Sequence, residues 1–198
     1  MKTEWCLDAD LSVINRECWR LLREGVSSYK HPFHFAVFTT IEDHFPAART
    51  VIIRGVDMEN KIIRFNTDVR SPKFQQIKKN PNITWLFYDE TLRIQMRCKA
   101  VASLHTDDVI AEQGWQEARL NCKITYTPSQ APGSFLEEPF FLDLNQLDIP
   151  EPVLNLARNN FSIVQTKILS LDWVFLHYKG NRRAFFDYKN NIQTWMQT

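Results

Sequence analysis

The chain has 198 residues, of which 44% are hydrophobic, 24 are Lys or Arg and 23 are Asp or Glu; this suits one domain with a sizeable core and excludes wholesale disorder. A net charge of +1 gives no bulk electrostatic reason to expect a nucleic acid or an acidic membrane as partner. No apolar run approaches the roughly 18 residues of a membrane-spanning helix, and Glu4 and Asp8 interrupt the start where a signal peptide would be apolar, so we expect a cytoplasmic protein.

Apolar residues recur at three- and four-residue spacing from Leu11 to Val26, which predicts an N-terminal helix over about 10–28. Ser71 followed by Pro72 predicts the start of a short helix, with Ser71 as its N-cap, and Asn80 ends it. Runs rich in aromatic and β-branched residues predict strands at 33–41, 49–56, 61–67, 82–88 and 92–104.

Thr106 is the predicted cap of another helix, which carries Trp115. We expect a loop over 121–133 and irregular structure around the prolines that follow it, up to Pro152. The remaining predicted elements are a short helix at 153–158 and strands at 161–168, 172–178 and 183–188.

The first three predicted strands follow one another without an intervening helix, which argues against parallel winding. We therefore predict an α+β fold: a mainly antiparallel, small barrel with N-terminal and peripheral helices. As a single domain over 1–198, it would have its barrel core at about 33–104 and its C-terminal strands at about 160–196.

Glycine, cysteine and histidine spacing excludes several kinds of site. No two of the five glycines are closer than 19 residues, so neither a GxGxxG turn nor a P-loop is present, and a phosphate must be held by side chains or a helix start. The four cysteines form no CxxC pair and the five histidines no HExxH motif, so we expect no metal site.

Three segments carry more polar residues than plain structure needs. A strand end, hydroxyl groups and cations meet a helix start between Thr67 and Lys73, a combination that can bind an anion. The strand Arg49–Arg54 has an arginine at each end, and the alternating row Arg93, Gln95, Arg97 and Lys99 shares one strand face. Each segment also fits an ordinary solvated surface, and the residues alone leave that alternative open.

Taken in order, these segments resemble the pyridoxamine 5′-phosphate oxidase-like flavoproteins, a family of FMN-binding split barrels. The resemblance runs from about Phe33 to Ala100. Its carriers are Arg49–Arg54 with Gly55, Phe65-Asn66-Thr67-Asp68 leading to Ser71 and Lys73, Asn80-Pro81 before Trp85-Leu86-Phe87-Tyr88, and Gln95-Met96-Arg97. A weaker likeness resumes at Trp115–Arg119, at Arg182-Arg183 and at Trp195, and the layout is closer to the oxidase-related FMN proteins than to the vitamin B6 oxidases.

The resemblance implies FMN as cofactor, a homodimer that shares each flavin across its interface, and an oxidoreductase that moves a hydride between a small anionic substrate and the flavin. It assigns the phosphate to Thr67, Ser71 and Lys73, and contacts with the flavin ring to Gln95 and Arg183. The full set that it implies for the cofactor is Arg49, Thr50, Val51, Ile52, Arg54, Asn66, Thr67, Ser71, Lys73, Gln95 and Arg183. The set for the substrate is Arg54, Trp115 and Arg119.

The sequence departs from the oxidases in three places. Pro72 stands before Lys73 where they have an arginine, and Arg70 is a possible replacement. Trp115, Arg119 and Lys123 stand where the oxidases bind the substrate phosphate, and their Arg-x-His element has no counterpart near Arg183. The alternative is therefore a non-enzymatic flavin- or haem-binding module, for which His177 would be the residue to examine as a haem ligand.

Overall fold

The computed structural model describes residues 4–144 and 149–198. Its α-helices are α1 (Glu4–Asp8), α2 (Leu11–Ser27), α3 (Pro72–Lys79), α4 (Val109–Glu117), α5 (Leu120–Ile124) and α6 (Glu151–Asn160), and a short 3₁₀ helix, η1 (Pro32–His34), precedes the first strand. The strands are β1 (Phe35–Glu42), β2 (Phe45–Ile52), β3 (Gly55–Asp57), β4 (Ile62–Asp68), β5 (Asn82–Asp89), β6 (Ile94–His105), β7 (Phe161–Phe175), β8 (Arg182–Asp187) and β9 (Ile192–Trp195).

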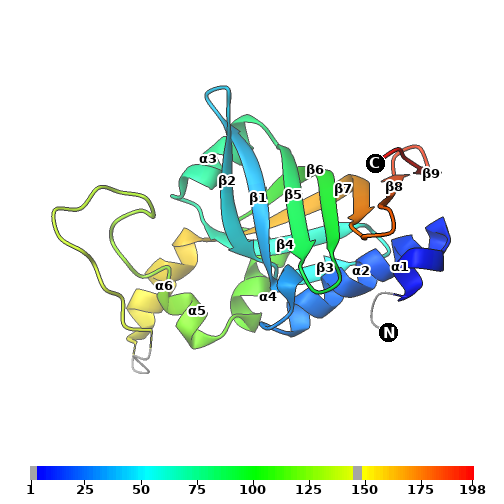
Figure 1. Cartoon of the computed structure of the whole chain (residues 1–198). Helices are drawn as coiled ribbons and strands as arrows, with labels where there is room; N and C mark the ends of the chain where they lie inside the picture. The colour runs from blue at the N-terminus through cyan, green and yellow to red at the C-terminus, as the bar shows by residue number, and fades with distance from the viewer. Residues whose placement is uncertain (1–3, 145–148) are drawn as a thin grey trace.

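The strands form one antiparallel sheet in the order β2-β1-β5-β6-β7-β4-β3, with β8 paired to β7 and β9 paired to β8. Within the described residues β2 and β3 end this path and do not pair with each other, so the sheet curls without closing (Figure 1). The predicted α+β fold with a mainly antiparallel split barrel is confirmed.

Several predicted boundaries were wrong. The strand expected at 49–56 is two strands, because the chain leaves β2 after Ile52 and re-enters the sheet as β3 at Gly55. The two strands expected at 161–168 and 172–178 are the single 15-residue β7, which pairs along its length with β6 through a bulge at Lys99/Ala100. Asp108, not Thr106, caps α4, since its side chain accepts a hydrogen bond from the backbone N–H of Ala111 at 2.9 Å.

The structure also contains elements that the sequence pattern did not predict. Helix α1 precedes α2, helix α5 lies in the segment expected to be a loop, and β9 adds a short strand near the C-terminus. Each of these elements has only four or five residues. Elements of that length show too few repeats of an apolar pattern to be recognised by periodicity.

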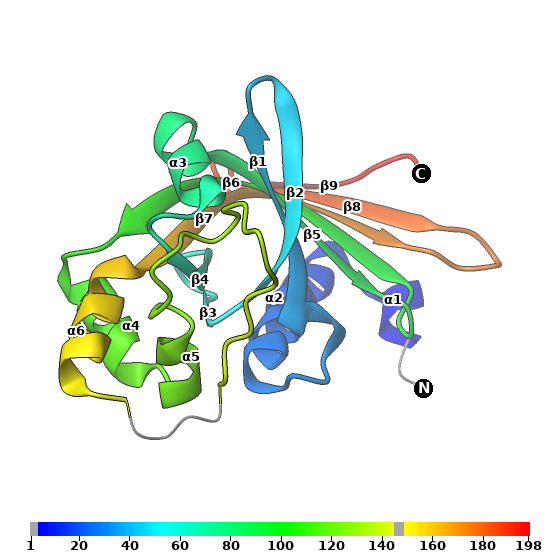
Figure 2. The same cartoon turned by 90° about the vertical axis from the view of Figure 1, so that its left-hand side faces the viewer.

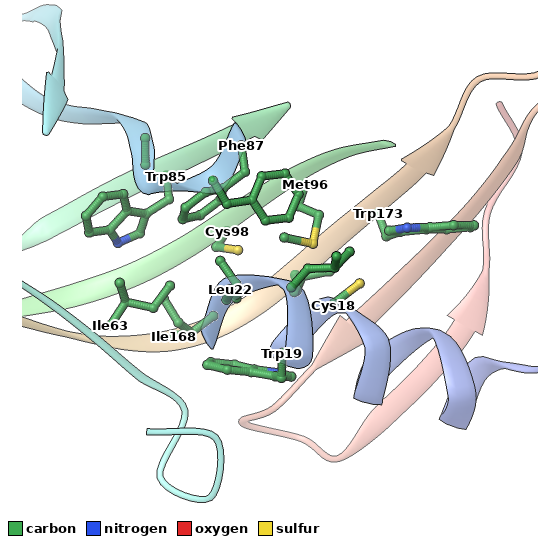
Figure 3. Close-up of a cluster of buried hydrophobic side chains, with 14 of the residues drawn as sticks. Cys18, Trp19, Leu22, Ile63, Trp85, Phe87, Met96, Cys98, Ile168 and Trp173 are labelled. Atoms are coloured by element: carbon green, nitrogen blue, oxygen red, sulfur yellow. The ribbon is translucent and has the colours of Figure 1, made fainter. Parts of the chain in front are cut away.

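The main core lies between α2 and the concave face of the sheet. Figure 3 shows Cys18 and Leu22 of α2 directed toward Met96 and Cys98 of β6. All four side chains are fully buried. Burial of a large apolar side chain contributes about 1.5–3 kcal/mol, so this helix and sheet stabilise each other chiefly through apolar contact. Burial also raises the pKa of the Cys18 and Cys98 thiols, which makes both thiols poor nucleophiles.

A second, smaller cluster joins the peripheral helices to the sheet. Phe161 and Ile163 of β7 pack with Tyr126 and Ala157, and Trp115 of α4 packs against them. After Tyr126 the chain runs as a long loop over 127–144, and Figure 2 shows this loop passing between helices α4–α6 on one side and β2 on the other.

Among the described residues, no helix combines the length and the apolar character that crossing a membrane would take.

Candidate functional site

Helix α3 and the strands beside it bring four of the predicted residues together. Lys73 Nζ lies 3.2 Å from Thr67 Oγ1, and Thr67 Oγ1 lies 3.2 Å from Ser71 Oγ. Arg49 lies on the same side, because it pairs across β1 with the buried Phe38 and directly opposed residues of antiparallel strands share a face. We call Arg49, Thr67, Ser71 and Lys73 the anion cradle.

The two cations of the anion cradle have no carboxylate partner within 4.0 Å in the described part of the chain. Burial and the nearby Arg49 guanidinium lower the pKa of Lys73, although Asp68 acts in the opposite direction. Burial likewise lowers the pKa of Arg49. Two like charges held together and partly removed from water are unfavourable unless an anion joins them, so the cradle has the electrostatics of an anion site.

Local geometry leaves the start of α3 open. Ser71 occupies the N-cap position as predicted, but its hydroxyl donates to Asp68 O at 2.7 Å and makes no capping hydrogen bond to α3. The first turn of the helix therefore has no side-chain acceptor at its positive end. Arg70 does not substitute for a cradle cation, since its guanidinium is paired with Asp68 (2.7 Å and 3.0 Å) and also donates to Pro128 O at 2.9 Å.

The other predicted residues of β2 lie along an edge of the sheet. In the described residues β2 pairs only with β1, so one side of its backbone N–H and C=O groups is free of sheet hydrogen bonds. Thr50 is exposed, whereas Val51 and Ile52 are half-buried. This edge gives a planar ligand a row of backbone donors and acceptors next to the cradle.

A cleft of about 390 Å³ opens beside β4, and three predicted residues, Arg54, Asn66 and Arg119, line it. Arg64 lines it as well, and its guanidinium is paired with Glu117 at 3.0 Å. Gly55 lets the Arg64 side chain reach this position, because a Cβ at Gly55 would lie 2.3 Å from Arg64 Nε.

The charge of this cleft is unbalanced. Glu117 is paired with Arg64, whereas neither Arg54 nor Arg119 has an ion-pair partner among the described residues. Among the described residues, the side-chain partner of Arg54 Nη2 is Cys122 Sγ, at 3.8 Å. The cleft is thus a second region that favours an anion, separate from the anion cradle.

The structure places Trp115 in the wall behind this cleft instead of on its surface. Its ring lies 5.3 Å from that of Phe161 and 6.2 Å from that of Tyr126, and it is not among the residues that line the cleft. Lys123 lies with its ammonium 5.2 Å from the Trp115 ring. Trp115 thus packs with the second core cluster and supports Arg119, which follows the C-terminal end of the same helix.

Gln95 and Arg183 face away from the anion cradle. Gln95 alternates with the buried Ile94 and Met96, so it points from the outer face of the sheet, where the register aligns it through Val174 with Arg183. Arg183 is bound to Asp172 by two hydrogen bonds, at 2.9 Å and 2.7 Å, and Arg97 shares the same carboxylate at 2.6 Å. Of the predicted row, Arg93 is the exception, since it lies in a turn with a φ of 53°.

Three polar residues near these regions were not predicted. Thr40 and Gln76 contact Arg49, and Arg64 lines the cleft. A polar residue among the apolar positions of α3 was the only available signal for Gln76.

His177 lies in the turn between β7 and β8, stacked on Phe175 at 5.4 Å, and its Nδ1 accepts a hydrogen bond from the backbone of Lys179. In the described residues no three potential metal ligands gather at one place.

Comparison with known proteins gives consistent matches. The family model for the pyridoxamine 5′-phosphate oxidase FMN-binding domain matches residues 16–106. A curated relative, pyridoxine/pyridoxamine 5′-phosphate oxidase 2 of Arabidopsis thaliana, is 29% identical over 175 residues, which cover 82% of each protein.

Two crystal structures share the fold over nearly the whole chain. A pyridoxamine 5′-phosphate oxidase-related, FMN-binding protein of Nostoc punctiforme has a TM-score of 0.69 and 20% identity, with 92% of this chain and 96% of that one covered. PhzG of Burkholderia lata, in complex with tetrahydrophenazine-1-carboxylic acid, has a TM-score of 0.70 and 11% identity, with 98% and 96% covered. The family model, the curated relative and the fold agree: residues 16–106 match the FMN-binding domain of the pyridoxamine 5′-phosphate oxidases, and the chain as a whole shares the fold of these FMN-binding proteins.

Proposed function

We propose that this protein is an FMN-dependent oxidoreductase that acts on a small anionic substrate. The observation that carries the proposal is the anion cradle, where Arg49 and Lys73 lie partly buried beside the open start of α3 with no carboxylate partner in the described chain. A phosphate monoester fits this donor set, because it accepts hydrogen bonds from cations, hydroxyl groups and helix N–H groups together.

The placement of the remaining cofactor residues favours a homodimer. The cradle faces the inner side of the sheet, whereas Gln95 and Arg183 face the outer side, so one chain does not enclose a ligand with both sets. Asn66 alternates with the buried Phe65 and Thr67 and therefore also points to the outer side. The outer face also carries half-exposed apolar side chains, among them Phe35 and Tyr88. In our proposal a second copy covers this face and brings its Gln95 and Arg183 to the flavin held by the cradle and the β2 edge.

Arg54 and Arg119 are the proposed substrate-binding residues. Both line the cleft, and both carry charges that no described carboxylate balances. A carboxylate or phosphate group on the substrate would meet these guanidiniums, and Asn66 would add a polar contact at the flavin side. Trp115 contributes by holding the wall that carries Arg119.

Bound FMN would supply the redox chemistry by accepting or donating a hydride. The chain's own task is then to bind the phosphate, orient the substrate over the ring and exclude water. Neither the cradle nor the pair of substrate arginines includes a carboxylate or an imidazole that could serve as a general base.

Titration of the purified protein with FMN and with riboflavin, followed by visible absorption, tests the cofactor assignment. We expect tighter binding of FMN than of riboflavin, because riboflavin lacks the phosphate that the cradle would hold. Addition of pyridoxamine 5′-phosphate in air then tests the oxidase activity through release of pyridoxal 5′-phosphate and peroxide. Equal affinity for the two flavins would contradict the phosphate site, and bound flavin without turnover would point to another anionic substrate.

A further inference from the structure

Arg49 is held entirely by neutral oxygen atoms. Its guanidinium donates to Thr40 Oγ1 at 2.5 Å, to Gln76 Oε1 at 2.9 Å and to Phe38 O at 3.5 Å. Thr40 Oγ1 in turn donates to Gln76 Oε1 at 2.5 Å. Gln76 Oε1 thus accepts two hydrogen bonds, which is the full capacity of an amide oxygen, and the orientation of the guanidinium is fixed.

The holding residues are themselves rigidly placed. Thr40 is fully buried and Gln76 is 6% exposed. Gln76 comes one helical turn after Lys73 on α3 and lies inward between the buried Phe74 and Ile77. It therefore links the helix that carries Lys73 to the strands β1 and β2, and it sets the position of one cation relative to the other.

A carboxylate at this place would serve equally well as a hydrogen-bond acceptor, but it would cancel the charge of Arg49. Asp68, which acts electrostatically on Lys73, is engaged by Arg70 through both of its carboxylate oxygens. Glu42 on β1 acts electrostatically on Arg49, but no ion pair within 4.0 Å joins the two in the described part of the chain. Neither acid therefore pairs with a cradle cation, and Arg49 is oriented without being neutralised.

We propose that Gln76, with Thr40, is a positioning residue that keeps Arg49 uncompensated for a phosphate, and that the neutrality of Gln76 sets the affinity of the site for dianions. This inference rests on the proposed binding of FMN phosphate. It extends that proposal by identifying the residue on which the charge of the cradle depends.

The test compares two near-isosteric variants, Gln76→Glu and Gln76→Met. We expect Gln76→Glu to weaken FMN binding at neutral pH by about tenfold or more, because a charge-assisted contact with the phosphate is lost, while riboflavin binding changes little. Lowering the pH should restore FMN binding as the introduced carboxyl group is protonated. We expect Gln76→Met to weaken FMN binding at every pH, since it removes the acceptor without adding a charge.

Inorganic phosphate provides a second readout that does not require a flavin. Phosphate should raise the melting temperature of the wild-type protein and of Gln76→Met more than that of Gln76→Glu. Wild-type FMN affinity in Gln76→Glu, or an equal loss of FMN and riboflavin, would overturn the inference. If the wild-type protein does not prefer FMN to riboflavin but phosphate still stabilises it in this variant-dependent way, the proposed function fails and the charge role of Gln76 stands.

Discussion

Replacement of Lys73 by methionine should affect the free protein and the ligand-bound protein in opposite directions. In the free protein, Lys73 is partly buried beside the Arg49 guanidinium, and burial followed by that guanidinium lowers the pKa of Lys73. Methionine keeps the apolar stem and removes the charge. We therefore expect Lys73→Met to leave the unliganded protein as stable as the wild type or more stable.

Ligand binding should weaken in the same variant. Removal of Lys73 deletes one charge-assisted contact with the phosphate and leaves Arg49, Ser71 and the start of α3 in place. Such a contact contributes about 1.5–3 kcal/mol. Since each 1.4 kcal/mol is tenfold in affinity, FMN binding should weaken by about 10- to 150-fold.

The measurements are FMN and riboflavin titrations by flavin absorption, together with thermal unfolding with and without FMN. Lys79→Met is the matched control, because Lys79 is exposed in the last turn of the same helix. The control should bind FMN like the wild type. Unchanged FMN affinity in Lys73→Met, or a loss of stability large enough to explain weaker binding, would refute the assignment of Lys73 to the phosphate.

Four further outcomes are expected. The stability of the free protein should rise with pH between the lowered folded-state pKa of Lys73 and its ordinary value of 10.5, because the unfolded chain binds more protons there, and chemical denaturation should show no such rise for Lys73→Met. Arg119→Gln should raise KM for an anionic substrate by roughly tenfold or more and leave the FMN spectrum unchanged, so loss of flavin would move Arg119 into the cofactor site. Trp115→Ala should lower the melting temperature and raise KM for the substrate, because it removes the ring that packs against Phe161, whereas Trp115→Phe should bring both values close to those of the wild type. Asp172→Asn should raise the reduction potential of bound flavin, since Arg183 and Arg97 lose their shared counter-charge, and an unchanged potential in a redox titration would place Arg183 away from the ring.

The fold was predictable because its strands follow one another as long aromatic and β-branched runs, and because α2 has a regular apolar stripe. The break between β2 and β3 was not predictable from the strand pattern, since neither Ile53 nor Arg54 is a turn-forming residue. The length of β7 was missed for a similar reason. The adjacent apolar residues Ile168 and Leu169 break the alternation in polarity at its centre, where the register with β6 shifts, but pairing with β6 on both sides of this point keeps the strand continuous.

The candidate site was predictable where its residues lie close in sequence. Thr67, Ser71 and Lys73 span a strand end and a helix start, so local rules place them together. The contribution of Gln76 and Thr40 depends on how α3 packs against β1, 36 residues apart in the chain, and no local pattern encodes that contact. The position of Trp115 behind the cleft likewise depends on Phe161, a residue from a distant strand.

Arg49 and Arg183 were predicted for the same cofactor, yet the fold treats their charges differently. Arg49 is oriented by neutral oxygens and keeps its charge, whereas Arg183 shares a carboxylate with Arg97. Although burial favours the protonated acid, the two guanidiniums lower the pKa of Asp172, so this cluster carries a net charge of about +1 at neutral pH. If the outer face of one copy meets the cradle of the other, the phosphate would lie beside two uncompensated cations and the ring beside a partly neutralised pair. A full charge at the phosphate strengthens binding in both redox states alike. A partly neutralised charge near the ring limits how strongly the protein favours the reduced, anionic flavin. The affinity for FMN and the reduction potential of the flavin can therefore be set by separate residues.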